Sequence, residues 1–508
     1  MVKLADAQLL GIRRGIEKES LRALPGGTLA MTPHPLPLGS ALTHPSITTD
    51  YSESQLELIT GVHATPEDAL RELTDVHQAT YAVLASEGQE RLWVSSMPCG
   101  LPTDETIPIG RYGNSNIGRA KSIYRMGLSQ RYGRRMQTIS GIHYNWSLPG
   151  VTSEEYFGLI RNFRRHSFLL LYLFGASPAL CSSFVAGRGH ELLPLTSNGS
   201  DGHVHTFHMP HATSLRMGRL GYQSDAQALL AVSYNNLDSY AASLEDALVH
   251  AYAPYEAIGV RSPGGDYNQL STSLLQIENE FYGTIRPKRV IRSGERPLHA
   301  LRERGVEYVE VRCMDLDPFE PVGINTQTMR FNDVFLLHCL TSDSPPDTPE
   351  EIAALSRNQH RVAARGREKD LQLEYGGRTR SLADWGSEVL RGCEPMAAAL
   401  DAAHGGSAYG DALMEARRRL IKPETTPSAR VLEAMKAEFG NSHVRFVQAR
   451  SEAIREHISS LPHAAGLDAH YARLAQESLA AQARIEAADT LDFEEFRQRY
   501  VAPAALEI

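Results

Sequence analysis

A pair of carboxylates inside an otherwise apolar, strand-like segment is the feature that most constrains the fold of this chain. Residues 15–22 read GIEKESLR, which places Glu17 and Glu19 two positions apart. In an extended strand, residues two apart point to the same face of the sheet. Two neighbouring carboxylates repel each other unless a proton or a cation compensates them, and a hard divalent metal is the usual compensating ion. The segment therefore predicts a metal-binding face on a β-sheet.

Three further strand-like segments carry single polar residues among apolar neighbours. They are Glu57 in the run LEL, His143 in the run IHY, and Glu310 with Arg312 in the run VEVR. Taken singly, each has a simpler explanation, such as an exposed strand face, a structural histidine or a salt bridge. A carboxylate within an apolar strand is, however, rarely buried without a partner. Several strands that each contribute one hard ligand form an economical site for Mg²⁺ or Mn²⁺.

The order of the expected elements indicates the fold class. Strand-like and helical segments follow one another without a regular alternation, which favours an α+β fold with a mainly antiparallel sheet. The expected strands lie near residues 12–22, 53–60, 137–148, 270–283 and 306–315, and the expected helices near residues 66–90, 153–174 and 225–252.

The chain changes character near residue 345. Residues 1–345 form the sheet-bearing active-site part, whereas residues 346–508 are rich in Ala, Leu, Glu and Arg and predict a mainly helical C-terminal region. Glycine pairs at 376–377 and 405–406 are expected to interrupt the helices. This region could form a layer on the sheet or a separate domain. We favour the layer, which makes residues 1–508 a single catalytic domain.

Composition narrows the functional classes. The net charge of −9 argues against broad nucleic-acid binding, and no apolar run is long enough to span a membrane. The five cysteines are scattered and form no CxxC pair, which makes a disulfide framework or a zinc site a poor expectation. Without a signal-peptide pattern, the simplest interpretation is a cytoplasmic protein with reduced thiols. The cysteines are Cys99, Cys181, Cys313, Cys339 and Cys393.

Basic residues and missing motifs together indicate how a nucleotide would bind. The chain contains neither a GxxxxGK[ST] loop nor a GxGxxG turn after a strand, and neither a GxSxG elbow nor an HExxH helix. Arginines beside tyrosines, as in Tyr124-Arg125, and the basic run 285–289 suit small ligands with carboxylates or phosphates. The residues thus predict a metal-dependent enzyme that acts on small anionic substrates, with nucleotide phosphates held through metals and arginines.

Six ordered motifs resemble those of the bacterial glutamate–cysteine ligases of the gammaproteobacterial type. The similarity runs in order from about residue 11 to 340 and continues more weakly through the helical tail. Several long motifs in the same order are far more specific than any one of them. The motifs are residues 15–22, 40–50, 136–145, 172–179, 276–289 and 307–312.

The resemblance implies a six-stranded, mainly antiparallel sheet wrapped by helices, related to the glutamine synthetase and guanidino kinase fold. It also implies the first step of glutathione biosynthesis, in which L-glutamate, L-cysteine and ATP give γ-glutamylcysteine, ADP and phosphate. The expected cofactor is ATP with Mg²⁺, with Mn²⁺ as an alternative. Neither a nucleic-acid partner nor a membrane is expected, and feedback by glutathione is a further expectation.

The resemblance assigns roles to individual residues. Arg216 falls at the amino-acid site, and Arg312 lies beside the transferred phosphate, with Glu310 as its catalytic neighbour. The metal ligands are Glu17, Glu19, Glu57, His143 and Glu310, with Asp50 added to the cluster. The cysteine pocket comprises Tyr124, Arg125, Leu128, Gln137, Ile139, Tyr222 and Tyr282. The residues expected to bind the nucleotide are Arg286, Lys288 and Arg289.

Two local features differ from the pattern of the family, and three other functions are compatible with the residues. Tyr51 stands where a close relative has phenylalanine, and the histidine-rich segment 203–208 is interpreted as a surface loop. The first rival is another carboxylate–amine ligase of the same superfamily with a different amine substrate. The others are a non-catalytic binding protein that keeps the fold, and a metal-dependent hydrolase that cleaves its substrate without ATP.

Overall fold

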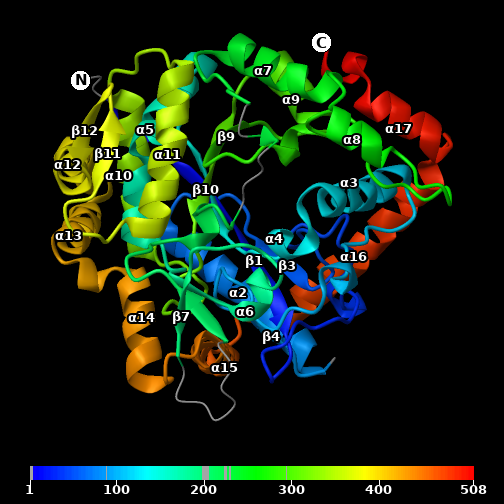
Figure 1. Cartoon of the computed structure of the whole chain (residues 1–508), viewed down its shortest axis with the longest axis horizontal. Helices are drawn as coiled ribbons and strands as arrows, with labels where there is room; N and C mark the ends of the chain where they lie inside the picture. The colour runs from blue at the N-terminus through cyan, green and yellow to red at the C-terminus, as the bar shows by residue number, and fades with distance from the viewer. Residues whose placement is uncertain are drawn as a thin grey trace.

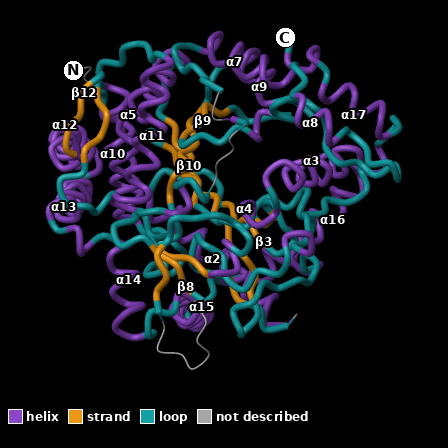
Figure 2. The backbone as a smooth tube through the Cα atoms, in the orientation of Figure 1, coloured by secondary structure: helices purple, strands orange, loops and turns teal. Residues whose placement is uncertain are grey.

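A computed structural model describes residues 4–86, 88–196, 205–221, 226–227, 230–292 and 294–507. At its centre lies a sheet, whose strands are orange in Figure 2. Every pairing in this sheet is antiparallel. The strand order is β2 (Ile47–Thr49), β3 (Gln55–Ile59), β1 (Arg13–Ala23), β5 (Ile142–Ser147), β10 (Tyr308–Met314) and β9 (Ile285–Lys288). A seventh strand, β4 (Arg91–Leu92), pairs with the end of β1.

The predicted antiparallel sheet is therefore present, with one strand more than expected. The extra strand arises because β1 is 11 residues long and extends beyond its pairing with β3. Its last two residues, Arg22 and Ala23, pair with Leu92 and Arg91. Two residues without alternation give no strand signal in the sequence.

Three helices cover one face of the sheet: α2 (Pro66–Ser86), α5 (Ser153–Phe174) and α10 (Thr326–Thr341). Alternation directs Ile16, Tyr144 and Val311 to this face, where all three are buried. An ion pair between Arg14 on β1 and Asp333 on α10, 2.9 Å apart, is also buried there. The opposite face, which carries the acidic residues, is thereby left for the cleft.

The C-terminal helices lie around this body on several sides (Figure 1). On one side, α11 (Pro349–Arg365), α12 (Leu382–His404) and α13 (Ala408–Ile421) pack on α5 and α10. On the other sides, α15 (His443–Ser460) packs on α2, and α17 (Phe493–Val501) packs on α3 (Asn116–Tyr132). The remaining C-terminal helices are α14 (Pro427–Glu438) and α16 (Leu467–Ala488).

The glycine pair at 376–377 was expected to interrupt a helix, but it forms the turn of a hairpin. Gly376 and Gly377 join β11 (Gln372–Tyr375) to β12 (Arg378–Ser381) in a hairpin, and both have positive φ, 54° and 75°. A two-residue hairpin turn of this kind requires positive φ, which explains the glycine pair. Gly405, by contrast, follows the end of α12 directly, as expected.

Shorter elements connect these layers. They are α1 (Asp6–Leu10), α4 (Arg134–Gln137), β6 (Ala179–Cys181), α6 (Ser182–Val185), β7 (Leu193–Leu195), β8 (Thr206–His208), α7 (Leu237–Val249), α8 (Ala253–Ile258) and α9 (Pro297–Arg304). Strands β6, β8 and β7 form a small separate sheet. None of the helices within the described ranges is both long and apolar enough to cross a bilayer.

The strand expected near residues 270–283 is absent, and the neighbouring strand is β9 at Ile285–Lys288. The polar residues of the expected strand instead hold a loop. Glu278 accepts hydrogen bonds from Arg296 and from the backbone N–H of Leu298, and Glu280 pairs with Arg131 at 2.8 Å. Because β9 lies at the sheet edge, it tolerates Pro287, which removes one backbone donor.

Two further expectations need correction. The helix expected at 66–90 ends at Ser86, and the one expected at 225–252 is helical from Leu237 to Val249. The expectation of unpaired thiols is wrong for two of the cysteines, because Cys99 and Cys181 form a disulfide. Cys313, Cys339 and Cys393 are free and buried.

Candidate active site

The register of the central strands brings the predicted acidic residues onto one face. On β1, Glu17 lies opposite His143 of β5, and Glu19 lies opposite Glu57 of β3. On β10, Glu310 lies opposite Asn145, which is two residues beyond His143 on β5. Residues two apart on a strand share a face, so all these side chains project from the same side of the sheet.

His143 is the centre of this group. Its Nδ1 lies 3.0 Å from Glu17 Oε2 and 3.6 Å from Glu310 Oε1, while its Nε2 lies 3.6 Å from Glu19 Oε1. Asn145 Nδ2 donates a hydrogen bond of 2.9 Å to Glu17 Oε1. The backbone N–H of Gly141 donates to Glu19 Oε2 at 2.7 Å. The cluster is therefore fixed by its own hydrogen bonds.

The cluster holds more carboxylates than it can ionise without help. Burial, followed by repulsion from Asp50, raises the pKa of Glu19 to about 8. Burial and the neighbouring Glu17 raise the pKa of Glu57 well above its usual value. Burial opposes ionisation of Glu310 as well, but Arg312 and Lys288 outweigh it and hold its pKa well below the usual value. A hard cation would relieve the repulsion that keeps protons on Glu19 and Glu57.

The donor set fits such a cation. Glu310 Oε2 and Asn145 Oδ1 are buried oxygen atoms without a hydrogen-bond partner among the described residues. Buried acceptors of this kind are costly unless something binds them. Carboxylate and amide oxygens with one imidazole are ligands that suit Mg²⁺ and Mn²⁺.

Positive side chains border the acidic cluster on one side. Arg312 Nη1 lies 3.1 Å from Glu310 Oε1, and Lys288 Nζ lies 3.4 Å from the same oxygen. Arg286, on the same edge strand as Lys288, donates to the backbone oxygen of Asn279 at 2.9 Å. The cleft thus places cationic groups next to oxygen donors, which is an arrangement for binding phosphates through metals and arginines.

These groups open into a cleft of about 580 Å³. Its polar wall is the acidic cluster with the neighbouring cations, and its other wall is mainly apolar and comes from helices and loops. Most of the predicted site residues line it: Glu17, Glu19, Asp50, Glu57, His143, Glu310, Arg312, Arg286, Lys288, Tyr124, Arg125, Leu128, Gln137 and Tyr282.

Three predicted residues are placed differently, and a fourth is not among the described residues. Arg216, with Arg312 and Tyr282, borders a small adjoining cavity of about 40 Å³. Ile139 is fully buried, and its backbone oxygen accepts a hydrogen bond from Gln55. Arg289 does not line the cleft and lies 3.6 Å from Glu307. Tyr222 lies outside the described residues, as do residues 203–204. Residues 206–208 of the histidine-rich segment form β8 and pair with β6 and β7, so the expected surface loop is wrong for them.

Several functional residues were missed in the sequence. Asn145, which donates a hydrogen bond to Glu17, could have been found, because it lies two residues after His143 and therefore shares its face. Lys121 is one turn of α3 before Arg125, and burial lowers its pKa to about 8. Ile485 and Tyr500 come from the C-terminal helices and have no local signal, since apolar helical residues are normally core.

The cleft has the chemistry of an enzyme that handles small anionic substrates with the help of hard cations. Comparison with known proteins specifies the family. A family model for glutamate-cysteine ligase matches residues 2–362. The chain belongs to the glutamate–cysteine ligase family.

Individual relatives agree with this assignment over the whole chain. The glutamate–cysteine ligase of Alcanivorax borkumensis is 47% identical, covering 98% of this chain and 97% of the relative. That of Azotobacter vinelandii is 48% identical, covering 96% and 94%. The crystal structure of the Francisella tularensis glutamate–cysteine ligase in complex with AMP has a TM-score of 0.89 at 36% identity, with 97% of each chain covered.

Proposed function

We propose that this protein joins the γ-carboxylate of L-glutamate to the amine of L-cysteine at the expense of ATP, giving γ-glutamylcysteine, ADP and phosphate. The observation that carries the proposal is the convergence of four acidic or imidazole-bearing strands beside Arg312 and Lys288 in a chain of this family. The AMP bound to the Francisella relative supports a nucleotide in the same cleft.

The oxygen-rich cluster would hold the divalent cations. The proposed ligands share the cleft face and are Glu17, Glu19, Glu57, His143 and Glu310, with Asp50 at the cleft wall. When bound, Mg²⁺ or Mn²⁺ would neutralise charge on the ATP phosphates. Burial and the nearby Arg312 lower the pKa of His143, which favours the neutral imidazole that a metal requires as a ligand. Asn145 orients Glu17 by its hydrogen bond.

Activation of glutamate is the chemical problem that this cluster would solve. Amide formation from a carboxylate and an amine in water is unfavourable, so the γ-carboxylate attacks the γ-phosphorus of ATP in line and forms γ-glutamyl phosphate. Arg312 stabilises the transferring phosphoryl group, and Glu310, 3.1 Å away, fixes the guanidinium. The cysteine amine then displaces phosphate. Loss of one such charged contact costs about 3–4 kcal/mol of barrier.

The two walls of the cleft suit the two halves of a nucleotide. Arg286 and Lys288 lie beside the acidic cluster and would bind phosphates, whereas Arg289 lies beside Glu307, does not line the cleft and is left out of this role. The apolar wall includes Leu270, Ile277 and Tyr500. These side chains would bury the flat face of an adenine base.

The amino-acid substrates would lie at the end of the cleft near α3. Tyr124, Leu128 and Tyr282 provide an apolar surface there, and Gln137 Nε2 donates to Tyr282 Oη at 2.8 Å. A pocket of aromatic faces with a few polar groups suits the small side chain of cysteine. Arg216, beside Arg312, would bind a substrate carboxylate.

Three wider assignments accompany this proposal. The antiparallel sheet with metal-binding acidic residues on one face supports placement in the glutamine synthetase and guanidino kinase superfamily. Ile485 and Tyr500 line the cleft, which supports a single catalytic unit over residues 1–508. ATP and the thiol form of cysteine are both maintained in the cytoplasm, which supports that location. Feedback by glutathione remains a proposal by analogy with the family.

The decisive test measures ADP release with magnesium while each substrate is omitted in turn. We expect ADP to form only when glutamate and cysteine are both present, and chelation of the metal to stop it. Turnover with a different amine would favour the first rival ligase. Substrate cleavage without ATP would favour the hydrolase, and an inactive but folded protein would favour the binding protein.

A further inference from the structure

A small cavity adjoins the cleft at Arg312, and part of its wall comes from the C-terminal helical layer. The volume of this cavity is about 40 Å³. Tyr282 and Arg312 border both spaces, so these two side chains separate the cavity from the cleft. Arg216 and Gln359 border the cavity but do not line the cleft. Gln359 belongs to α11, and no feature of the sequence pointed to it as a site residue.

The size of the cavity suits a small polar head group. Since one water molecule needs about 10–15 Å³ of such space, the cavity holds roughly three waters. The carboxylate and the ammonium of one α-amino acid occupy a space of that order, whereas a nucleotide does not fit. The cavity is therefore suited to one end of a ligand whose remainder lies in the cleft.

Arg216 is held in place by the strand that carries Arg312. Its Nη2 donates to the backbone oxygen of Arg312 at 2.9 Å, and its Nη1 lies 3.9 Å from Asp315 Oδ1. Both Arg216 and Asp315 are buried. A planar guanidinium at the border of a cavity is suited to a carboxylate ligand, which it can bind through two parallel hydrogen bonds.

Gln359 is oriented by its own side-chain amide. Its Nε2 donates to the backbone oxygen of Met217, which also borders the cavity, at 3.1 Å. No donor from the described part of the chain reaches Gln359 Oε1, so this oxygen is available to a ligand as an acceptor. A carbonyl acceptor near a guanidinium complements an ammonium near a carboxylate. This pairing is the head group of an α-amino acid.

Helix α11 is bonded directly to the segment that carries Arg216. The backbone N–H groups of Thr213 and Ser214 both donate to the backbone oxygen of Ala363, at 2.9 and 3.2 Å. Ala363 lies in the last turn of α11, one turn beyond Gln359. Arg216 follows in a single 3-10 turn. These hydrogen bonds fix the position of Gln359 relative to Arg216.

The chemistry of the two amino acids assigns the cavity to glutamate rather than to cysteine. In glutamate, three carbon–carbon bonds separate Cα from the reacting γ-carboxyl carbon, roughly 4 Å when extended. In cysteine the reacting atom is the α-amine itself, so its head group must stay at the reaction centre in the cleft. Glutamate can instead place its head group in the adjoining cavity while its γ-carboxylate remains beside Arg312.

We propose that this cavity binds the head group of L-glutamate, with Arg216 on the α-carboxylate and Gln359 Oε1 accepting a hydrogen bond from the α-ammonium. The inference rests on the proposed function. It goes further, because it assigns the cavity to one of the two amino acids and gives a residue of the C-terminal layer a part in specificity. Gln359 then distinguishes glutamate from dicarboxylates that lack the amine.

The test removes the amide and the amine in turn. Glutarate is glutamate without its α-amine, and it keeps both carboxylates. In Gln359→Leu, kcat/KM for glutamate should fall about 10- to 100-fold, because a hydrogen bond to a charged group is lost. The value for glutarate should change less than about threefold. ADP release at saturating ATP and cysteine measures both, and Gln372→Leu, at an exposed position of β11, is the matched control.

Binding is measured separately from turnover. Glutamate and glutarate are titrated by calorimetry into the protein with Mg²⁺ and a non-hydrolysable ATP analogue. In Gln359→Leu, Kd for glutamate should rise about 10- to 100-fold, and Kd for glutarate should stay within about threefold. This readout also serves if glutarate binds without being turned over.

Two further variants separate the two halves of the head group. Gln359→Glu keeps an oxygen acceptor for the ammonium, so its preference for glutamate over glutarate should be at least that of the wild type. In Gly141→Ala the new Cβ would lie 2.0 Å from Arg216 Nη2, so the guanidinium must move. Glutamate and glutarate should then lose kcat/KM by the same factor, within about threefold, because both carry the carboxylate.

Equal losses for glutamate and glutarate in Gln359→Leu would overturn the contact with the ammonium. If that variant does not fold, a lost preference for glutamate in folded Gln359→Glu would overturn it instead. A raised KM for cysteine with an unchanged KM for glutamate would assign the cavity to the other substrate and so overturn the proposal. A wild-type protein that releases no ADP with glutamate and cysteine would contradict the proposed function, while the titrations would still decide what the cavity binds.

Discussion

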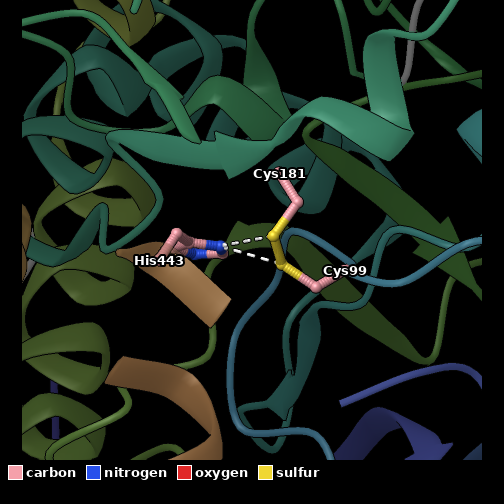
Figure 3. A group of neighbouring side chains, drawn as sticks. All are labelled: Cys99, Cys181 and His443. Atoms are coloured by element: carbon pink, nitrogen blue, oxygen red, sulfur yellow. Dashed lines mark hydrogen bonds between the residues drawn. A yellow bond between two sulfur atoms is a disulfide. The ribbon is translucent and has the colours of Figure 1, made fainter. Parts of the chain in front are cut away.

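Two of the clusters in the described part of the chain each combine one histidine with two side chains that can ligate a metal, and they differ in how their charge is compensated. In the cleft, His143 lies between Glu17 and Glu310, beside the cations Arg312 and Lys288. In the closed cluster, His443 faces Cys99 and Cys181, which are joined covalently (Figure 3). The first opens into a cavity and leaves oxygen acceptors without partners, whereas the second is fully buried.

This difference indicates that the cleft cluster carries the chemistry and that the closed cluster stabilises the fold. In the cleft cluster, oxygen atoms without partners among the described residues lie beside the fixed cations Arg312 and Lys288. The remaining positive charge that these oxygens need would be supplied by bound metal ions. A disulfide needs no compensating charge, because bond formation consumes both thiols. We therefore expect damage to the cleft cluster to act on turnover, and damage to the closed cluster to act on stability.

The largest effect should come from the cleft. Glu310→Gln and Arg312→Lys should each lower kcat about 100- to 1,000-fold, because the first removes the carboxylate that fixes Arg312 and the second replaces the planar guanidinium that faces the transferring phosphoryl group by an ammonium that cannot keep the same hydrogen bonds. ADP release at saturating substrates measures the loss. Circular dichroism and thermal melting should show a folded protein, and the exposed Arg357→Lys serves as the matched control. Near-normal turnover in both cleft variants would contradict the proposed placement of the phosphate.

The next effect should come from the disulfide. Cys99→Ser should lower the free energy of unfolding by about 2–4 kcal/mol, because the bond restricts the unfolded chain over a long loop. Guanidinium denaturation measures the change. Cys181→Ser and the double variant should lose the same amount, since one bond is broken in all three. Additive losses in the double variant would show that the two sulfurs contribute separately.

The same contrast explains what could be predicted from the sequence. The alternating pattern of the strand segments predicted the cleft cluster. Each of its residues interrupts an apolar run that must face a core: Glu17, Glu57, His143 and Glu310. The closed cluster had no such signal: its two cysteines lie 82 residues apart, and pairing over that distance has no local signature.

Other misses have equally local causes. Strand β9 was placed too early, because the polar residues at 276–280 imitate alternation while they actually bind arginines in a loop. Tyr500 was missed because an aromatic residue on an amphipathic helix is normally core. Only the packing of α17 against α3 brings this residue to the cleft.

A smaller effect should appear in the pH dependence of stability. The pKa of His443 is near 6.5 when the chain is unfolded and about 4 when folded, because burial disfavours the charged ring. The neutral ring therefore contributes stability that is complete above pH 6.5 and is lost as the pH falls towards 4, about 2–3 kcal/mol in all. Urea denaturation between pH 7 and 4 measures it. His443→Gln should be less acid-sensitive than the wild type by this amount, and parallel curves would contradict the prediction.

The smallest effect concerns the sulfur of the substrate, and it tests whether the two clusters divide their chemistry as proposed. The cleft cluster offers hard oxygen and nitrogen donors, so the substrate thiol should instead contact the aromatic pocket of Tyr124 and Tyr282. Such a pocket discriminates weakly, and 2-aminobutyrate in place of cysteine should lower kcat/KM by about 1–2 kcal/mol, roughly 5- to 30-fold. ADP release with each amine measures the ratio. Complete loss of turnover with 2-aminobutyrate would mean that the thiol itself is bound by a specific partner.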